Sequence, residues 1–405
     1  MNRRDLSILI ATAFATLVAC GTSRGENPTV LIRAKHVHTM AGETLSPGMV
    51  LVRDGKIAEV AESISVDPMP QVLEVDSVMP GMVNAQSTVG LVGSGGEASR
   101  EVTPEFETVG MIDFESRDFR EAIDGGETTV HIMPSTDNVI AGWTCLIKTM
   151  GGDPDSRSLL ARKGVALSMC SDPAGRNRSR SRPDSIFVRQ PTNRMGVVWI
   201  LRNQLQQAKY PSPGKDSGAT GALSEMLSGK APAFGVSRTT IDIQSLLTIA
   251  EEFGFAPIVV GGHEAYDVID LLKETDTTVI YTAVDERPVG AEGSELFWAT
   301  PTRLRDAEIP FCIAGDGLLE KMRLAVRFGL TADEAMKSVT VDAANVLGLS
   351  DSVGKIAVGC DADLLGFSGP PTQMTSALQW VLINGERVAS PSPTSSGPSE
   401  PSDES

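Results

Sequence analysis

Short apolar β-type runs and helical periodicities divide this chain into successive blocks. From residue 30 to about residue 78 the pattern consists of strand-like runs, among them Val30–Arg33, Met49–Val52 and Ile57–Val60. Asp54-Gly55, between the last two runs, is a two-residue turn typical of a β-hairpin. The first block is therefore predicted to be a small β module.

The second block, residues 80–349, alternates apolar strand-like runs with helical patterns, as expected for parallel α/β units. The candidate strands are Thr128–Met133, Gly164–Met169, Ala256–Val260, Thr278–Tyr281 and Pro310–Ala314.

Two helices of this block are marked by their own signals. One presents a single apolar face and is predicted to stop at Gly254. Its face residues are Ile243, Leu246, Leu247, Ala250 and Phe253. A capping box from Thr331 to Glu334 opens another helix. That helix is predicted to carry Ala335, Val339 and Ala343.

The chain then returns to β patterns and ends in a polar tail. Residues 354–364 lead back to the β module, and residues 381–388 look like its last hairpin. From Ala389 onward the residues are Ser, Pro, Glu, Asp and similar polar types, without further apolar positions. The tail, residues 389–405, is predicted to be disordered.

The first 20 residues are predicted to be an export signal outside the fold. Arg3-Arg4 precedes the apolar run Leu6–Val18, which is shorter than a membrane-spanning helix. The sequence Leu-Val-Ala-Cys-Gly around Cys20 resembles a bacterial lipobox, which implies cleavage before Cys20 and lipid attachment to it. We expect an exported protein, lipid-anchored to a bacterial membrane and facing the periplasm or the cell exterior. A buried core helix is the alternative.

Composition excludes some functions. The chain has 405 residues, 41% of them apolar and 21% charged, and a formal net charge of −17. An acidic protein with few aromatic residues is unsuited to nucleic acid, and we expect membrane contact through the lipid anchor only. Four further cysteines show no metal-ligand spacing and are predicted to be buried small hydrophobic residues. They are Cys145, Cys170, Cys312 and Cys360.

Five segments carry a resemblance to a known family through their order and spacing. They are Pro80–Leu91, Glu101–Phe106, Gly126–Val130, Gly262–Leu272 and Arg327–Gly366. With them, residues 28–388 resemble a bacterial, imidazolonepropionase-like member of the amidohydrolase superfamily. The resemblance implies an α/β fold, a (β/α)8 TIM-type barrel inserted into a small composite β-sandwich. The barrel would be residues 80–349, and the sandwich residues 28–79 plus 350–388.

Members of this superfamily hold divalent metal ions at the C-terminal ends of their barrel strands. Where the first strand would end in His-x-His, this chain has Gln86-Ser87-Thr88, and Gly261 takes the place of the strand-six histidine. Residues 234–238, at the strand-five position, contain no histidine. Asp316 matches the final aspartate, which acts as acid and base in the family. A cap for the helix after it is the alternative role of Asp316.

The chain has four histidines. His36 and His38 share one face of a predicted strand, an arrangement that can bind a metal ion, but we favour a solvated strand face. His131 is predicted to be a hydrogen-bonded barrel residue. His263 lies two residues beyond Gly261, at the start of the following helix, where we expect it to face the barrel mouth. Local hydrogen bonding at a helix N-terminus is the alternative role of His263.

These residues do not make a binuclear metal site, because zinc prefers imidazole, thiolate or carboxylate over amide and hydroxyl oxygens. A metal lowers the pKa of its water by roughly 9 units, or about 12 kcal/mol, whereas a carboxylate base contributes only ~3–5 kcal/mol. We therefore expect no cofactor. His263 and Asp316 are the residual metal candidates, for zinc or another divalent ion, if the chain is a working enzyme.

Arginines alternate with Asn and Ser after the strand that ends near Met169. They are Arg176, Arg178, Arg180 and Arg182. In an acidic chain this segment is a possible anion-binding loop, and a solvated loop is the alternative.

Three hypotheses follow. The first is a lipoprotein with an amidohydrolase fold that lacks metal-dependent catalysis and binds a ligand or partner, as a pseudoenzyme. Its partner would be a second copy or a metal-competent amidohydrolase relative. The second is a hydrolase of carbon–nitrogen bonds in cyclic amides or dipeptide-like substrates, with a reduced metal site around Asp316. The third is a structural envelope protein, for which no specific feature speaks.

Overall fold

The computed structural model describes residues 29–388, apart from residues 69, 94, 98, 152–156, 178–189, 212–217 and 286–295. The predicted export signal with Cys20 and the predicted disordered tail, residues 389–405, lie outside the described residues.

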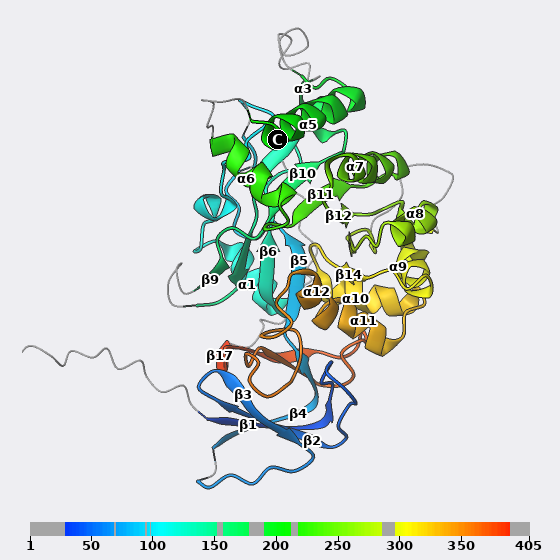
Figure 1. Ribbon diagram of the computed structural model, residues 1–405. Coiled ribbons are helices and arrows are strands. Elements are labelled where there is room, and N and C mark those ends of the chain that lie inside the picture. The colour runs from blue at the N-terminus through cyan, green and yellow to red at the C-terminus, as the bar shows by residue number, and fades with distance from the viewer. Residues whose placement is uncertain are drawn as a thin grey trace, which may run out of the picture.

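The N- and C-terminal segments together form one seven-stranded sheet of order β17-β16-β15-β4-β1-β2-β3. Its strands are β1 (Val30–Val37), β2 (Gly48–Arg53), β3 (Lys56–Ala61), β4 (Gln71–Pro80), β15 (Leu364–Phe367), β16 (Leu378–Ile383) and β17 (Glu386–Val388). The predicted hairpin is confirmed: β2 and β3 pair antiparallel, and Asp54 and Gly55 both have positive φ. Strands from opposite ends of the sequence lie side by side in Figure 1.

The middle of the chain forms two further sheets. The six-stranded sheet has the order β14-β13-β12-β11-β10-β7, and the four-stranded sheet β5-β6-β8-β9. Their strands are β5 (Met82–Ser87), β6 (Glu127–Ile132), β7 (Ile140–Trp143), β8 (Cys145–Lys148), β9 (Ser158–Leu160), β10 (Val165–Ser168), β11 (Ala233–Ser237), β12 (Pro257–Gly261), β13 (Val279–Tyr281) and β14 (Phe311–Ile313). All five candidate strands are therefore confirmed within one or two residues.

One part of the sheet departs from an all-parallel barrel. β5 and β6 are parallel, and so are β10 to β14, but β8 pairs antiparallel with β6 and β7 pairs antiparallel with β10. The link from β6 to β7, residues 133–139, is too short for the crossover that parallel strands need. The chain therefore turns back, and the expectation of eight parallel strands is wrong at this position.

The side chain of Asn84 joins β5 to the strand at the far end of the other sheet. Its Nδ2 donates to the carbonyl oxygen of Gly315 at 3.2 Å, and its Oδ1 accepts from the Gly315 N–H at 3.0 Å. Among the described residues no backbone ladder pairs β14 with β5. The arrangement is a mixed α/β fold, consistent with a TIM-type barrel.

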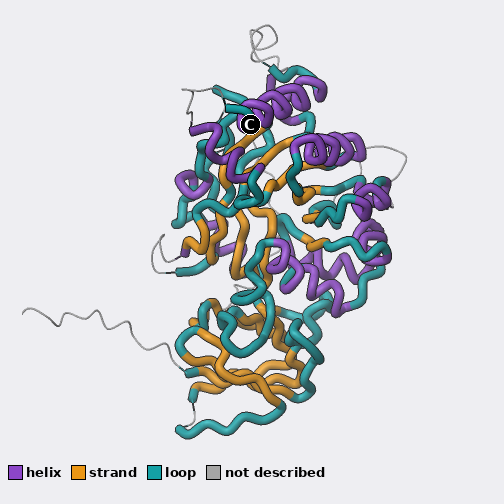
Figure 2. Tube along the Cα trace, in the orientation of Figure 1, coloured by secondary structure: helices purple, strands orange, loops and turns teal. Residues whose placement is uncertain are grey.

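Helices lie around the strands of the middle segment, whereas the seven-stranded sheet carries strands and loops only (Figure 2). The helices are η1 (Thr108–Met111), α1 (Arg117–Asp124), α3 (Asp172–Asn177), α5 (Arg194–Lys209), α6 (Gly218–Leu227), α7 (Thr240–Phe253), η2 (Ala265–Asp267), α8 (Ile269–Glu274), α9 (Leu296–Asp306), α10 (Leu318–Arg327), α11 (Ala332–Ser338) and α12 (Val341–Val346). Within the described ranges, none of them is long and apolar enough to cross a membrane.

Both helix signals are confirmed. α7 ends at Gly254, which has a φ of 79°, and Thr331 and Glu334 form the reciprocal capping box of α11. The prediction that one helix carries Ala335, Val339 and Ala343 is wrong, because the helical backbone is interrupted between α11 and α12. The break is at Thr340, whose φ of −129° and ψ of −96° are not helical.

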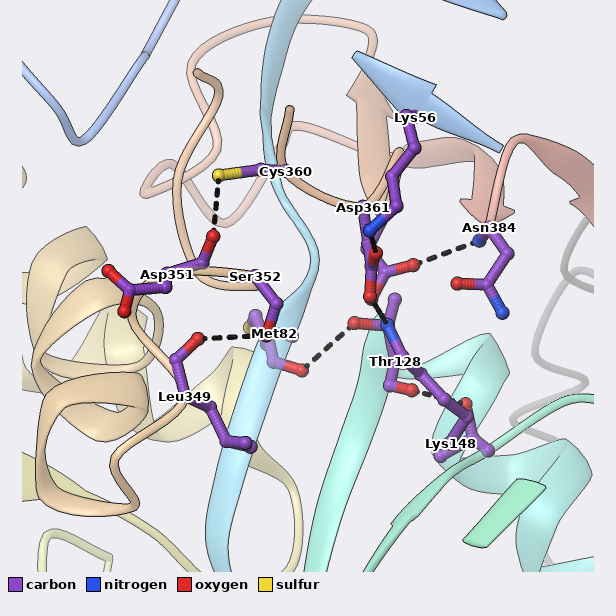
Figure 3. Close-up of polar contacts among 12 residues, drawn as sticks. Lys56, Met82, Thr128, Lys148, Leu349, Asp351, Ser352, Cys360, Asp361 and Asn384 are labelled. Carbon is purple, nitrogen blue, oxygen red and sulfur yellow. Dashed lines mark hydrogen bonds and ion pairs between the residues drawn. The ribbon is translucent and has the colours of Figure 1, made fainter. Parts of the chain in front are cut away.

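A buried ion cluster joins the middle segment to the seven-stranded sheet (Figure 3). Lys148, at the end of β8, donates to Asp363 and, at 3.0 Å, to Asp361. Its side chain is 2% exposed. Asp361 also accepts from Lys56 at 2.5 Å, and Asp363 accepts from the Asn384 N–H at 2.9 Å. Burial lowers the pKa of Lys148, but the two carboxylates outweigh it and the pKa is raised.

Candidate functional site

The C-terminal end of β5 places Gln86 beside the loop that follows β14. Gln86 is half-buried and Thr88 is exposed. The Oε1 of Gln86 lies 3.8 Å from the point where a Cβ on Gly315 would stand. Gly315 has a φ of 97°, which glycine adopts without strain, and its missing side chain leaves room here. The two strand ends therefore meet at one place.

A lysine from α10 fills the space beside them. The Nζ of Lys321 lies 3.1 Å from the same Cβ position on Gly315. It donates to the carbonyl oxygen of Thr282, just after β13, at 2.6 Å, and to Asp285 at 2.8 Å. The Lys321 side chain is only 7% exposed. A buried positive charge thus stands among the C-terminal ends of β5, β13 and β14.

His263 faces this charge from the loop after β12. Its Nε2 lies 3.3 Å from the hydroxyl of Thr282. Burial first, and then the charges of Arg238 and Lys321, lower the pKa of His263 to about 4. The imidazole is therefore neutral at physiological pH.

Arg238 stands at the end of β11, where no histidine was found. Its Cγ lies 3.4 Å from the point where a Cβ on Gly261 would stand. Its guanidinium pairs with Asp172 at 2.9 Å, and Asp172 also accepts from Thr136 at 2.5 Å. Because Asp172 follows β10, the ends of β10 and β11 supply an ion pair.

Asp316 lies in the loop between β14 and α10, and it is exposed. The residue that caps α10 is Gly317, with a φ of 70° and no side-chain hydrogen bond. The alternative role of Asp316 as the helix cap is therefore wrong. Asp316 therefore stays a candidate catalytic residue, and only its position after β14 supports this role.

Behind Asp316 a second carboxyl group is buried. Glu127, at the start of β6, is 5% exposed and accepts from the Nδ2 of Asn84 at 2.9 Å. Burial raises the pKa of Glu127 to about 7. The hydrogen bond from Asn84 opposes this shift, and the charge of Asp316 adds to it. This carboxyl titrates near neutral pH, but burial keeps it from contact with substrate.

The other histidines lie outside this cluster. His131 is fully buried, with Nδ1 at 2.8 Å from the carbonyl oxygen of Ala85 and Nε2 at 2.7 Å from the hydroxyl of Thr144. Its predicted hydrogen bonding is confirmed, and the residue lies in β6. His36 and His38 are half-buried, 6.4 Å apart between ring centroids. Each lies beside a hydroxyl, at Ser46 and Thr44 respectively.

Two further predictions have different outcomes. The four cysteines within the described residues are buried, as predicted, and the structure shows them to be free. Of the anion-binding loop, Arg178, Arg180 and Arg182 lie outside the described residues, as does the side chain of Arg176.

The donor set at the strand ends fits a divalent metal ion poorly. It offers an amide, a hydroxyl, one imidazole and one exposed carboxylate beside the two cations Lys321 and Arg238. Across the described ranges, no group of three or more His, Cys, Asp or Glu is arranged to hold a metal. Zinc and other transition metals prefer imidazole, thiolate and carboxylate ligands.

A cavity of about 410 Å³ lies at the opposite end of the strands. Its lining includes Arg305, Asp342 and Asn345, together with residues that precede β13 and β14. The residues of the candidate site follow those strands, so this cavity is separate from it.

Comparison with known proteins agrees with the mixed α/β fold. A model of the Amidohydrolase family matches residues 256–388. An amidohydrolase from Thermotoga maritima MSB8 superposes with a TM-score of 0.81 at 25% identity, over 89% of this chain and all of that one. Residues 256–388 therefore match the Amidohydrolase family, and the chain as a whole resembles an amidohydrolase structure.

Two further proteins extend the comparison. Amidohydrolase tasK of Hapsidospora irregularis is 25% identical over 395 residues, which cover 84% of this chain. This chain spans only 39% of that protein's length. An adenosine deaminase from Xanthomonas campestris with bound zinc shares the fold, with a TM-score of 0.51 at 16% identity over 88% of this chain and 92% of that one.

The sequence analysis missed Lys321, Arg238 and Glu127. A signal existed for one of them. Lys321 lies three residues after Leu318 and four before Ala325, on the apolar face of its helix, which predicts burial. For Glu127 only the structure reveals that every position of its strand is buried. A charge in such a strand has to be paired or neutral.

Proposed function

We propose that this chain is an amidohydrolase-fold protein that binds a ligand or a partner at the mouth of its strands, without metal-dependent catalysis. One observation carries the proposal: the Lys321 ammonium stands where the ends of β5, β13 and β14 meet. In metal-dependent relatives, the activating cation has to sit at the strand ends to make hydroxide available.

Electrostatics supports this proposal. A divalent ion about 4 Å from an ammonium group is repelled by on the order of 8 kcal/mol at an effective dielectric constant of about 20. Arg238 adds a second positive charge. The pairing of Lys321 with Asp285 and of Arg238 with Asp172 offsets part of both charges. Neither Gln86 nor Thr88 brings a negative charge to compensate.

A second candidate function is hydrolysis of carbon–nitrogen bonds in cyclic amides or dipeptide-like substrates. The exposed carboxylate of Asp316 favours it, because that group is free to contact a substrate. Under this alternative Asp316 and His263 would hold a single zinc or similar ion, and Asp316 would transfer protons.

We make three further proposals, on architecture, export and partners. The middle segment would be a TIM-type barrel inserted into a composite β-sandwich. Residues 1–20 would direct export, with lipid attached to Cys20. The protein would act as a homo-oligomer or beside a metal-competent amidohydrolase relative, and would bind no resident cofactor.

Hydrolysis assays separate the two functions. We expect the purified protein to hydrolyse neither N-acyl amino acids nor cyclic amides, with or without added zinc. Replacing Asp316 by alanine should then change nothing, as should replacing the exposed Asp270, which serves as the control. Zinc-stimulated turnover that falls by about 10²–10⁴-fold in Asp316→Ala, but not in Asp270→Ala, would establish the hydrolase instead.

A further inference from the structure

We propose that Lys321 binds the carboxylate group of a small ligand, and that Asp285 occupies this position in the ligand-free protein. The inference deepens the proposed function, because it requires a mouth without a metal ion. It rests on the burial of the ammonium, its hydrogen-bond partners and the exposure of Asp285.

The ammonium of Lys321 is held deep but incompletely satisfied. An ammonium group carries three N–H donors. Within the described part of the chain, Lys321 has two acceptors, the carbonyl oxygen of Thr282 and a carboxylate oxygen of Asp285. A buried charge with a donor left over is costly, so an additional acceptor at this point stabilises it.

Asp285 is the replaceable partner. Its side chain is 46% exposed, whereas that of Lys321 is 7% exposed. An exposed carboxylate gains little from such a pair, because water solvates it almost as well. A ligand carboxylate that displaces Asp285 can use both of its oxygens. One accepts from the Lys321 N–H that Asp285 leaves, and the other accepts from the third N–H of Lys321 or from the Gln86 amide.

The surroundings favour a single carboxylate over a larger anion. Arg238 already pairs with Asp172, so it adds no free positive charge. The exposed carboxylate of Asp316 opposes a ligand with several negative charges. The remainder of the ligand would lie outward, on the side of Thr88 and Asp316, both of which are exposed.

Butyrate and its neutral isostere butyramide test the inference by ligand-observed NMR in chelator-treated buffer. We expect butyrate to bind Asp285→Asn at least about tenfold more tightly than the wild type, because the internal competitor is gone. Lys321→Met, which preserves side-chain length, should lose butyrate binding. Butyramide should not distinguish the three proteins.

Two outcomes overturn the inference. One is butyrate binding to Lys321→Met as tightly as to Asp285→Asn, and the other is no butyrate binding to folded Asp285→Asn protein. Circular dichroism checks folding, and Asp285→Asn together with the wild type keeps the test decisive if Lys321→Met does not fold. Metal analysis of the same samples distinguishes failure of this inference from failure of the proposed function. Bound metal contradicts the proposed function, whereas absence of butyrate binding to metal-free protein contradicts only the carboxylate site.

Discussion

Replacing Lys148 by methionine is expected to lower the free energy of unfolding by about 3–5 kcal/mol, the usual cost of removing one partner from a buried ion pair. Lys148 is 2% exposed and neutralises Asp361 and Asp363, which are 14% and 2% exposed. Without it, two carboxylates are left close together, and within the described residues the exposed Lys56 is the remaining cation that pairs with either of them. Urea denaturation followed by circular dichroism measures the change.

Lys56→Met is the matched control for this prediction. Lys56 contacts the same Asp361, but its side chain is 54% exposed, so its removal is expected to cost at most about 1 kcal/mol. Equal losses of unfolding free energy in the two variants would contradict the prediction, because they would show that the burial of Lys148 does not determine its contribution to stability.

Replacing Glu127 by glutamine is expected to stabilise the protein at alkaline pH relative to acid pH. The pKa of Glu127 is raised from 4.5 to about 7 by burial. As the pH rises through this window, the unfolded carboxyl loses its proton before the folded one does, and the wild type loses stability. Since one pKa unit corresponds to about 1.4 kcal/mol, this contribution reaches about 3 kcal/mol above pH 7 and vanishes below pH 4.5.

Unfolding experiments at pH 4.5 and pH 8 measure this effect. The advantage of Glu127→Gln over the wild type should grow between the two pH values by up to about 3 kcal/mol. Glutamine keeps only one acceptor oxygen for the hydrogen bond from Asn84, which reduces the gain by a constant amount. Glu251→Gln, at an exposed position of α7, is the control and should show no such growth. A pH-independent difference for Glu127→Gln would contradict the buried titration.

Local signals in the sequence predicted the local structure well. Asp54-Gly55 fixes its hairpin because both residues adopt positive φ, and Gly254 ends α7 for the same reason. The five candidate strands followed from short apolar runs. Each of these predictions depends on interactions between residues close together in the chain.

The predictions that were wrong or missing concern features that depend on contacts between residues far apart in the sequence. The antiparallel course of β7 and β8 follows from a short link, and apolar pattern alone does not reveal strand direction. The break at Thr340 interrupts a periodicity that looks continuous. Gln86 and Lys321 are 235 residues apart in the sequence, and the folded backbone places both side chains beside Gly315.

The proposed function depends on one claim: the Lys321 ammonium takes the place at the strand ends that a divalent cation would need. Mass-spectrometric metal analysis of the full chain, purified after exposure to zinc and manganese, tests it most directly. We expect no stoichiometric metal in the wild type. A full equivalent of bound zinc or manganese, lost on Asp316→Ala but kept by Asp270→Ala, would contradict the claim.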